Sequence, residues 1–563
     1  MKNLVLVSMA IVSCFSQLIA YGSAFSGAKK SQTRYLETPY EASEECKSLV
    51  QQSDYRFTIV SAKLIKATED FPSHCRLDGL IPTEIRFEVN LPLQWNGRIY
   101  MYGNGGLAGT PANNPSKQWV RDQALRRSFA TSYTDTGHDK RILEGGTFAY
   151  KNHHRLVDYG FRAVHLTIQT AKLVAKHFYN HEANYSYWNG CSTGGRQAMI
   201  SAQRFPNDFD GIIAGAPAAD YSGLKFSQAW RTQAIGQSTL TEAKVETLGK
   251  TIYQQCDSLD GITDGLISDP RRCDFAPSRD LPTCLDKGDT SSSCFDSKEI
   301  EALEKYYSQV KLENKVIYPG MPVGSEVSSS GDGSGRVGWY PWLINPNGRT
   351  LLDALGSDFF RYMVKVKDDP SFDWNDFTFQ EAPDNLAEFR NIVDAIDPDI
   401  STFKKAGGKM VSYFGWADPD INPMTLINYY NEVKSIDSSV DSYFRVFMVP
   451  GMFHCRGGPG PDSFDMMSPL IDWVEQNIPP EQIPAWKETK EGKQLSRPLC
   501  PYPKEALLET TEFQCKVPTD IQDLPNLLGA ITIVTAPLAD HFVQQNAAIL
   551  VSKTVKSWLL NRD

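Results

Sequence analysis

The chain has 563 residues, with 57 Lys and Arg against 67 Asp and Glu, and therefore a formal net charge of −10. Apolar residues make up 41% and aromatic residues 11% of the chain, which is enough to bury a sizeable core and excludes a disordered protein. The acidic balance argues against nucleic-acid binding, because phosphate binding favours a basic patch. The eleven cysteines are an odd number, which raises the question of which one is left over.

The chain begins with the pattern of an export signal. Lys2 precedes an apolar stretch at residues 4–12, and small residues at 22–24 (Gly-Ser-Ala) offer a cleavage site. The stretch is too short to span a membrane. We therefore predict a signal peptide at residues 1–24 and a secreted or periplasmic protein. An alternative is a lipoprotein, because residues 11–14 (Ile-Val-Ser-Cys) resemble the box in which a cysteine is lipidated and retained.

Removal of this signal peptide also removes Cys14 and leaves ten cysteines. An even number in an exported chain predicts five disulfides, formed in an oxidising compartment. The same compartment argues against a zinc site built from these cysteines.

Strand-like and helical segments then alternate along the chain. They are expected as strands at 85–91 and 98–102, a loop at 103–106 (Gly-Asn-Gly-Gly), a helix at 161–179, a strand at 185–188, a helix at 197–203 and strands at 211–217, 409–415 and 445–449. This order is typical of an α/β fold with a parallel sheet. Residues 220–400 instead contain four cysteines, several Asp-Pro and Asp-Gly turns and few strand-like runs. We interpret this middle part as an insertion or lid.

The segment Gly-Cys-Ser-Thr-Gly at 190–194 matches the G-x-S-x-G pattern of a nucleophile elbow. It stands between a predicted strand and a predicted helix, as the motif requires. Its glycines permit a sharp turn that exposes the serine hydroxyl and directs helix N–H groups toward a developing oxyanion. The alternative is an ordinary Gly-rich turn, but the flanking elements favour Ser192 as the nucleophile.

A serine nucleophile needs a base and an acid, which follow it in the order acid, then histidine, in folds that use this elbow. Only two of the nine histidines follow the serine, His454 and His541. His454 comes directly after a strand-like run, whereas His541 lies in the tail and is interpreted as a surface or helix-start histidine. The acid is expected in the loop after the preceding strand, where Asp418 comes first and Asp420 is the alternative.

Two cysteines stand beside these candidates. Cys191 immediately precedes the predicted nucleophile and Cys455 immediately follows the predicted base. If the two pair, their disulfide ties the nucleophile loop to the histidine loop and fixes the geometry on which proton transfer depends.

Three segments together resemble the tannase and feruloyl esterase family. They are Gly-Cys-Ser-Thr-Gly-Gly-Arg at 190–196, Gly-Trp-Ala-Asp-Pro at 415–419 and His-Cys at 454–455. Residues 133–138 and the loop 103–106 also resemble stretches of that family. The resemblance extends over roughly residues 40 to 518.

The resemblance implies an α/β-hydrolase core with a large inserted lid. The expected domains are a signal peptide at 1–24, a first part of the core at 25–219, the lid at 220–396, and a second part of the core at 397–563 with a C-terminal extension from about 519. No membrane-spanning segment and no nucleic-acid partner are expected, and the oligomeric state is left open.

The activity that the resemblance implies is hydrolysis of small esters of aromatic carboxylic acids through an acyl-enzyme. The catalytic side chains would be Ser192, Asp418 and His454. The oxyanion donors would be the backbone N–H groups of Thr193 and of a glycine, either Gly105 or Gly106. A non-catalytic binding module and a serine peptidase are the alternatives. The acid that is accepted, among gallate, ferulate, chlorogenate and a terephthalate monoester, is left open.

The predicted lid contains a second polar cluster at residues 256–269, where carboxylates surround two Asp-Gly turns. Such a loop can provide the oxygen ligands that Ca²⁺ prefers, although plain acidic turns are an equal alternative and the spacing is not that of an EF-hand. The resemblance implies a structural calcium ion held by the side chains of Asp257, Asp260 and Asp264 and the carbonyls of Ile262 and Leu266. No organic cofactor is expected.

The resemblance also implies the remaining disulfides: Cys46–Cys75, Cys256–Cys273, Cys284–Cys294 and Cys500–Cys515. The lid is expected to supply the pocket for the acyl group. Its aromatic candidates are Trp339, Trp342, Phe359, Phe360 and Trp374, although such residues more often belong to the hydrophobic core. Arg336 and Arg196 could meet a carboxylate or phenol of the substrate, but a structural role is favoured for Arg196, just after the elbow.

Overall fold

The structure is a computed structural model that describes residues 25, 27 and 30–518, except 237, 285–290, 327–337, 341, 346–348, 365–370 and 489–493. The chain divides into two compact units, Met1–Leu527 and Leu528–Asp563, and every described residue belongs to the first. The predicted signal peptide, Cys14, Arg336, His541 and the C-terminal extension therefore lie outside the described residues.

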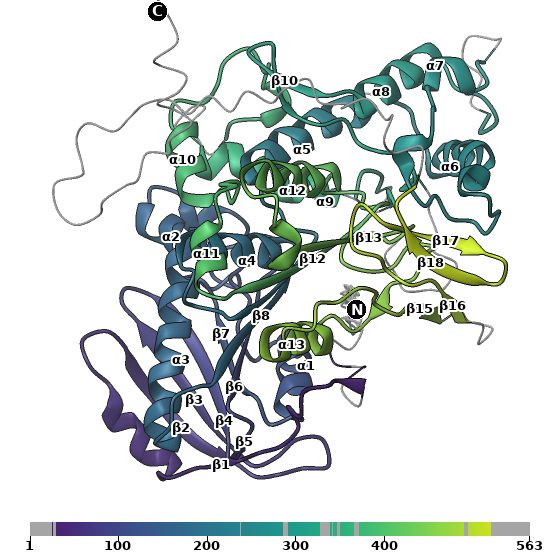
Figure 1. Ribbon diagram of the computed structural model, residues 1–563. Coiled ribbons are helices and arrows are strands. Elements are labelled where there is room, and N and C mark those ends of the chain that lie inside the picture. Colours follow the sequence, from purple (N-terminus) through teal and green to yellow (C-terminus); the bar gives the residue numbers. More distant parts are fainter. Residues whose placement is uncertain are drawn as a thin grey trace, which may run out of the picture. The chain divides into compact units, whose positions relative to one another are not determined.

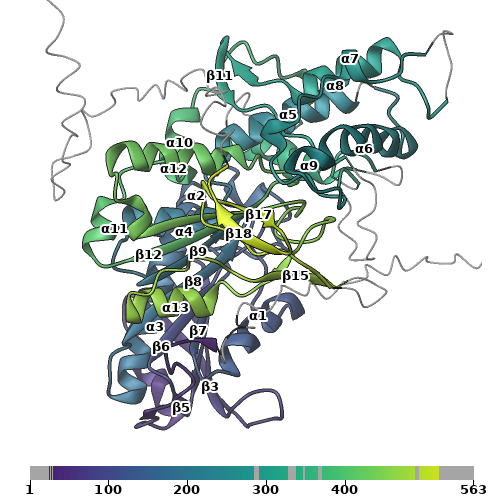
Figure 2. The same cartoon turned by 45° about the vertical axis from the view of Figure 1, so that its right-hand side comes forward.

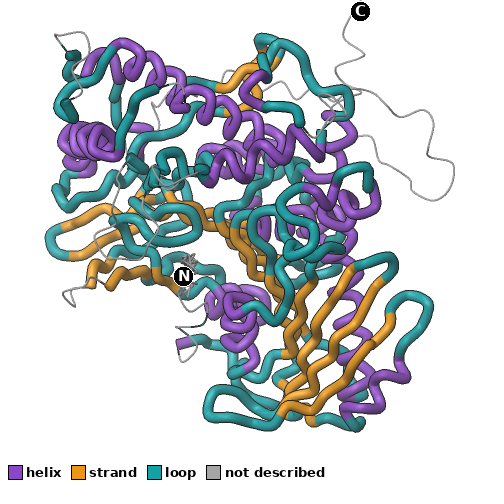
Figure 3. Tube along the Cα trace, turned by 180° about the vertical axis from the view of Figure 1, so that it is seen from behind, coloured by secondary structure: helices purple, strands orange, loops and turns teal. Residues whose placement is uncertain are grey.

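A nine-stranded sheet forms the centre of the described unit (Figure 1). In spatial order its strands are β13 (Phe444–Val449), β12 (Lys409–Gly415), β9 (Gly211–Gly215), β8 (Tyr185–Cys191), β6 (Arg98–Tyr102), β7 (Ala130–Thr134), β4 (Ile85–Pro92), β3 (His74–Ile81) and β2 (Thr58–Ile65). The first six strands run parallel to one another. Each of the last three is antiparallel to its neighbours, and these three form one edge of the sheet, which Figure 3 shows from behind. This arrangement confirms the predicted α/β fold.

Helices cover both faces of the sheet. The buried strands carry apolar residues on both sides, and these residues must be shielded from water. On β6, Ile99 and Met101 pack in one hydrophobic cluster, and Tyr100 and Tyr102 pack in another. The first cluster includes side chains from α3 (Ala163–Tyr179), α4 (Thr193–Arg204) and α12 (Met424–Ile436). The second includes side chains from α1 (Pro115–Leu125) and α13 (Met467–Gln476). Smaller elements of the core are β1 (Tyr40–Glu41), β5 (Gln94–Trp95), α2 (His153–Val157) and α11 (Ser401–Lys405).

A large, mostly helical insertion separates β9 from β12. It contains α5 (Tyr221–Gly236), α6 (Glu242–Cys256), α7 (Pro277–Asp280), α8 (Ser297–Tyr307), β10 (Val310–Leu312), β11 (Lys315–Tyr318), α9 (Leu351–Asp358) and α10 (Leu386–Val393). Part of it has its own hydrophobic cluster, which includes Leu248, Phe295 and Leu303. The insertion is the predicted lid, whose boundaries at 220 and 396 stay predictions.

Short antiparallel strands follow β13. They are β14 (Ser463–Phe464), β15 (Ala485–Glu488), β16 (Gln494–Ser496), β17 (Glu505–Glu509) and β18 (Glu512–Lys516). Figure 2 shows β15, β17 and β18 between the lid helices and α13. None of the helices in the described part of the chain is long and apolar enough to cross a membrane.

The predicted bounds of the elements agree with the structure where apolar runs are continuous, and they differ more where several glycines follow one another. The strand at 409–415 coincides with β12, whereas α4 begins at Thr193, four residues before the predicted helix. Gly194 and Gly195 occupy the first turn of α4 because they lie against other backbone. A Cβ at Gly195 would lie 2.3 Å from the Gly215 carbonyl oxygen. Tertiary packing therefore overrides the low helix propensity of glycine at this helix start.

Arg196 joins α4 to the lid. Its guanidinium is fully buried and donates hydrogen bonds to the carbonyl oxygens of Gly160 (2.9 Å), Val393 (3.0 Å) and Tyr159 (3.0 Å). It also lies over the Tyr159 ring, 4.7 Å from the centroid. Since Val393 belongs to α10, the side chain binds a lid helix to the core, which matches the structural role favoured from the sequence.

Replacing Arg196 should destabilise the protein strongly. In Arg196→Leu three buried carbonyls lose a charged donor, so we expect the free energy of unfolding to fall by about 3 kcal/mol or more. Arg204→Leu is the matched control: Arg204, at the end of the same helix, also donates to a carbonyl of α10, that of Asn391 at 2.8 Å, but it is exposed, so its replacement should cost about 1 kcal/mol or less. Urea unfolding with the disulfides intact measures both, and equal losses would contradict the role of Arg196.

Candidate active site

Ser192 lies at the turn between β8 and α4, as the sequence predicts. Its backbone has φ 64° and ψ −121°, an uncommon conformation for a residue other than glycine. The turn is tight enough that a Cβ at Gly190 would lie 2.6 Å from the Gly194 carbonyl oxygen. The strained backbone and the glycines around it are those of a nucleophile elbow.

His454 and Asp418 meet beside this turn. The Asp418 carboxylate contacts the His454 imidazole, with 2.7 Å between Oδ2 and Nδ1, and both side chains are buried. The other carboxylate oxygen accepts hydrogen bonds from the backbone N–H groups of Asp420 and Ile421, at 2.9 Å each. These bonds fix the orientation of the acid. Asp420, the alternative acid, binds Gln228 instead.

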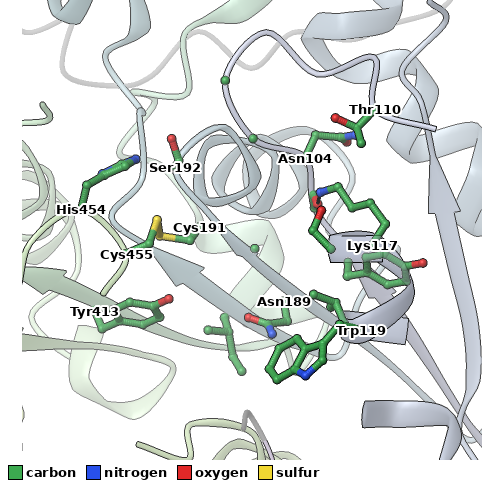
Figure 4. A pocket seen from close by; sticks show the side chains of 18 of the residues that line it. Asn104, Thr110, Lys117, Trp119, Asn189, Cys191, Ser192, Tyr413, His454 and Cys455 are labelled. Carbon is green, nitrogen blue, oxygen red and sulfur yellow. Dashed lines mark hydrogen bonds between the residues drawn. A yellow bond between two sulfur atoms is a disulfide. The ribbon is translucent and has the colours of Figure 1, made fainter. Parts of the chain in front are cut away.

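The imidazole of His454 lies next to the serine hydroxyl. Figure 4 shows the ring with one nitrogen directed toward Ser192 and the Cys191–Cys455 disulfide below them. The edge of the ring packs against Trp342 from the lid, with centroids 5.4 Å apart and planes at 84°. Ser192, His454 and Asp418 are therefore in the order and proximity of a catalytic triad.

The five disulfides are those expected. Cys191–Cys455 has a Cα–Cα distance of 6.1 Å, and it joins residues 264 positions apart. The others are Cys46–Cys75, Cys256–Cys273, Cys284–Cys294 and Cys500–Cys515. All five bonds lie within the usual Cα separation of disulfides.

A cleft of about 340 Å³ opens at Ser192 and His454. Most of its lining comes from the core rather than from the lid. Its aromatic lining residues are Tyr100, Tyr102, Trp119, Trp342, Tyr413 and Phe464. Figure 4 shows Trp119, Asn189 and Tyr413 on the far side of the disulfide from the serine hydroxyl.

The expected aromatic lid pocket is only partly present. Trp342 lines the cleft, together with Leu355. The other four candidates, Trp339, Phe359, Phe360 and Trp374, are buried in hydrophobic clusters of the lid and core. For these four the pocket role was wrong and the alternative, a core position, holds, because an aromatic residue type does not tell which side of a packed layer the side chain faces.

Three backbone N–H groups are available near the serine. Those of Thr193, Gly105 and Gly106 have no hydrogen-bond acceptor in the protein among the described residues, and both glycines line the cleft. Thr193 is the first residue of α4, where helix N–H groups have no partner within the helix. The choice between Gly105 and Gly106 as oxyanion donor stays a prediction.

Lys117, on α1, lines the cleft without having been predicted. Its Nζ donates to the Gly103 carbonyl oxygen at 2.8 Å and lies 5.2 Å from the centroid of the Tyr133 ring. Burial of the ammonium group, assisted by the charge of Lys140, lowers the pKa of Lys117 to about 7. No motif in the sequence distinguishes this lysine, because its place in the cleft depends on a contact between a helix and a distant loop.

The acidic lid loop is stabilised by its own backbone and by an arginine. Asp257 accepts hydrogen bonds from the N–H groups of Asp264, Gly265 and Leu266, and Asp260 accepts one from Ile262. The fully buried Arg497 contacts both Asp260 and Asp264, at 3.4 and 2.6 Å.

The donors of this loop are all oxygens, as calcium prefers. Burial, and to a smaller extent the charges of Asp260 and Asp257, raise the pKa of Asp264, so a further cation there would relieve repulsion between carboxylates. Arg497 already provides one positive charge at this place. Within the described ranges no three Asp, Glu, His or Cys side chains are grouped as a metal site, so calcium would need these carboxylates to turn from their present partners.

Comparison with known proteins agrees with this geometry. Residues 73–516 match the family model described as tannase and feruloyl esterase. The chain is 29% identical over 499 residues to mono(2-hydroxyethyl) terephthalate hydrolase of Piscinibacter sakaiensis, covering 77% of this chain and 82% of that protein. It is 32% identical over 435 residues to a probable feruloyl esterase of Arthroderma benhamiae, covering 73% and 78%.

The fold has a close counterpart among solved structures. Feruloyl esterase B from Aspergillus oryzae superposes with a TM-score of 0.71 at 26% identity, covering 84% of this chain and all of that one. The family model matches most of the chain, including the elbow, the acid loop and the histidine loop. The chain therefore belongs to the tannase and feruloyl esterase family and is a carboxylic ester hydrolase.

Proposed function

We propose that this protein is an exported serine esterase that hydrolyses esters of aromatic, phenolic carboxylic acids, such as gallate or ferulate esters. The observation that carries the proposal is the meeting of Ser192, His454 and Asp418 at a cleft whose two catalytic loops are joined by a disulfide.

The first step is acylation of Ser192. His454 takes the proton of the hydroxyl as the oxygen attacks the ester carbonyl, and Asp418 holds the imidazole in position and stabilises its positive charge. Oxyanion stabilisation comes from the N–H of Thr193 and of Gly105 or Gly106, which are free to donate. The tetrahedral intermediate collapses, and the alcohol leaves with the proton from the imidazolium.

The second step is hydrolysis of the acyl-enzyme. His454 takes a proton from a water molecule, which attacks the acyl carbonyl, and the acid departs as Ser192 regains its proton. No metal or organic cofactor is part of either step.

The lining of the cleft supports an aromatic acid. Its volume of about 340 Å³ is in the range of small-molecule sites. Flat aromatic side chains such as Trp342 and Tyr413 can stack on a phenolic ring, and the hydroxyl and amide groups of Tyr100 and Asn189 can bond phenolic oxygens. Five disulfides support function outside the cytoplasm, since reducing compartments disfavour them.

We expect Ser192→Ala to abolish turnover of p-nitrophenyl and methyl aryl esters, with a loss of kcat/KM of about 10⁴-fold or more. Ser186→Ala, in the same strand β8, is the control and should retain activity. Assays with methyl gallate, methyl ferulate and chlorogenate identify the acid. Equal activity of Ser192→Ala and wild type would remove the serine from the mechanism, and turnover of peptides but not of esters would indicate a peptidase.

The disulfide between Cys191 and Cys455 should be needed for catalysis more than for folding. In the double variant Cys191→Ser/Cys455→Ser we expect kcat to fall by about 10²-fold, because small displacements of the base from the nucleophile are costly. Cys46→Ser/Cys75→Ser is the control: it should lower the melting temperature but leave kcat near the wild-type value. Full activity in the first variant would contradict a positioning role for this disulfide.

We also propose that the acidic lid loop binds one calcium ion, through the side chains of Asp257, Asp260 and Asp264 and the carbonyls of Ile262 and Leu266. The oxygen-only donor set and the raised pKa of Asp264 support this proposal. Arg497 would share these carboxylates with the ion.

Metal analysis tests the calcium proposal. We expect about one calcium ion per chain in protein that has not been treated with a chelator. EDTA should lower the melting temperature, because a ligand that binds the native state stabilises that state. Asp260→Asn should lose the ion, whereas Asp274→Asn, an acid of the same lid outside the loop 257–266, should keep it. Protein free of calcium, with a melting temperature that EDTA and added calcium leave unchanged, would refute the site.

A further inference from the structure

Side chains from three helical segments hold the backbone carbonyls of the loop 103–106. Lys117 of α1 donates to the Gly103 carbonyl oxygen at 2.8 Å. At the other end of the loop, Thr193 Oγ1 of α4 donates to the Gly106 carbonyl oxygen at 2.5 Å, and the Tyr159 hydroxyl approaches the same atom at 3.3 Å. The loop is therefore bound at both ends by donors from outside it.

The middle of the loop is also restrained. The backbone N–H of Asn104 donates to Gln197 Oε1 at 3.1 Å. The Asn104 side chain donates to the Tyr133 hydroxyl at 2.9 Å and to the Thr134 carbonyl at 3.0 Å. The N–H groups of Gly105 and Gly106 have no acceptor among the described residues, and both residues line the cleft.

Peptide planarity links the carbonyls to the N–H groups. In a trans peptide the C=O of one residue and the N–H of the next point in opposite directions. Lys117 and Gln197 therefore hold the same peptide from its two sides, Lys117 at the Gly103 carbonyl oxygen and Gln197 at the Asn104 N–H. The next two peptides carry the free N–H groups of Gly105 and Gly106, and they rotate easily because these residues lack a Cβ. Their direction therefore depends on how firmly the peptide before them is held.

Among the side chains that donate to the carbonyls of this loop, Lys117 is the one that lines the cleft. It is half-buried and reaches from α1 to the loop (Figure 4). The Gly103 carbonyl is its one hydrogen-bond acceptor among the described residues. Gly103 lies so close to the elbow that a Cβ there would be 2.6 Å from the Gly194 Cα. A shift at Gly103 is therefore transmitted directly to the loop and to the helix start beside the nucleophile.

We propose that Lys117 is a positioning residue for ester hydrolysis: its amino group holds the Gly103 carbonyl and so fixes the peptide that precedes the free N–H groups of Gly105 and Gly106, which keeps these groups directed at the oxyanion. The inference rests on the proposed reaction at Ser192. It predicts that Lys117 stabilises the tetrahedral intermediate more than the bound ester, because the oxyanion exists only in the intermediate.

The test compares Lys117→Met with wild type on methyl ferulate, an uncharged ester, or on whichever methyl aryl ester the wild type hydrolyses best. We expect kcat to fall about tenfold or more with KM within twofold, because an interaction made only in the transition state is lost. Phenylboronic acid, which forms a tetrahedral adduct with an active serine, should bind more weakly by a similar factor. Lys117→Arg keeps a charged donor and should retain more activity than the methionine variant.

The control is Lys172→Met, which removes another lysine that donates to a backbone carbonyl, that of Asn207 at 3.0 Å. It lies on α3 outside the cleft and should leave kcat and boronate affinity unchanged. Unchanged kcat and boronate affinity in Lys117→Met, or a rise in KM alone, would overturn the proposal while the esterase activity stands. A wild type that hydrolyses no ester would overturn the proposed function and this inference together.

Discussion

The structure of the site depends on the covalent bond between Cys191 and Cys455. Ser192, the proposed nucleophile, follows β8, and His454, the proposed base, follows β13; two other strands of the sheet lie between β8 and β13. Proton transfer needs the two side chains within hydrogen-bond distance. Since loops are the mobile parts of a fold, a disulfide one residue from each catalytic side chain limits how far the two loops can separate.

The remaining parts of the site hold each catalytic group from a different direction. The acid is fixed by backbone N–H groups of its own loop, and Trp342 of the lid packs on the imidazole. Arg196 binds the helix behind the nucleophile to the last helix of the lid. The core thus supplies the chemistry and most of the cleft wall, while the lid closes over the base and is tied to the core by buried polar contacts.

The sequence predicted those features that are carried by local pattern. The elbow motif and chain order singled out Ser192, Asp418 and His454, which the structure brings together, and continuous apolar runs placed five of the six parallel strands, β13, β12, β9, β8 and β6. The parallel strand β7 was missed because hydroxyl side chains interrupt its apolar pattern. The antiparallel strands β2 and β3 were missed because they lie at the sheet edge, where β2 has a mixed burial pattern. The orientation of Trp339 and the contact of Lys117 depend on tertiary packing between distant segments, which no local pattern encodes.

The central claim, that Ser192 is the nucleophile of an ester hydrolase, is tested most directly by covalent trapping. The intact protein is treated with diethyl p-nitrophenyl phosphate, which phosphorylates activated serines, and the modified peptide is located by mass spectrometry. The account predicts one diethylphosphoryl group per chain, on Ser192, with loss of esterase activity in proportion to labelling. Labelling of a different serine that parallels the loss of activity, or activity that persists in fully labelled protein, would contradict it.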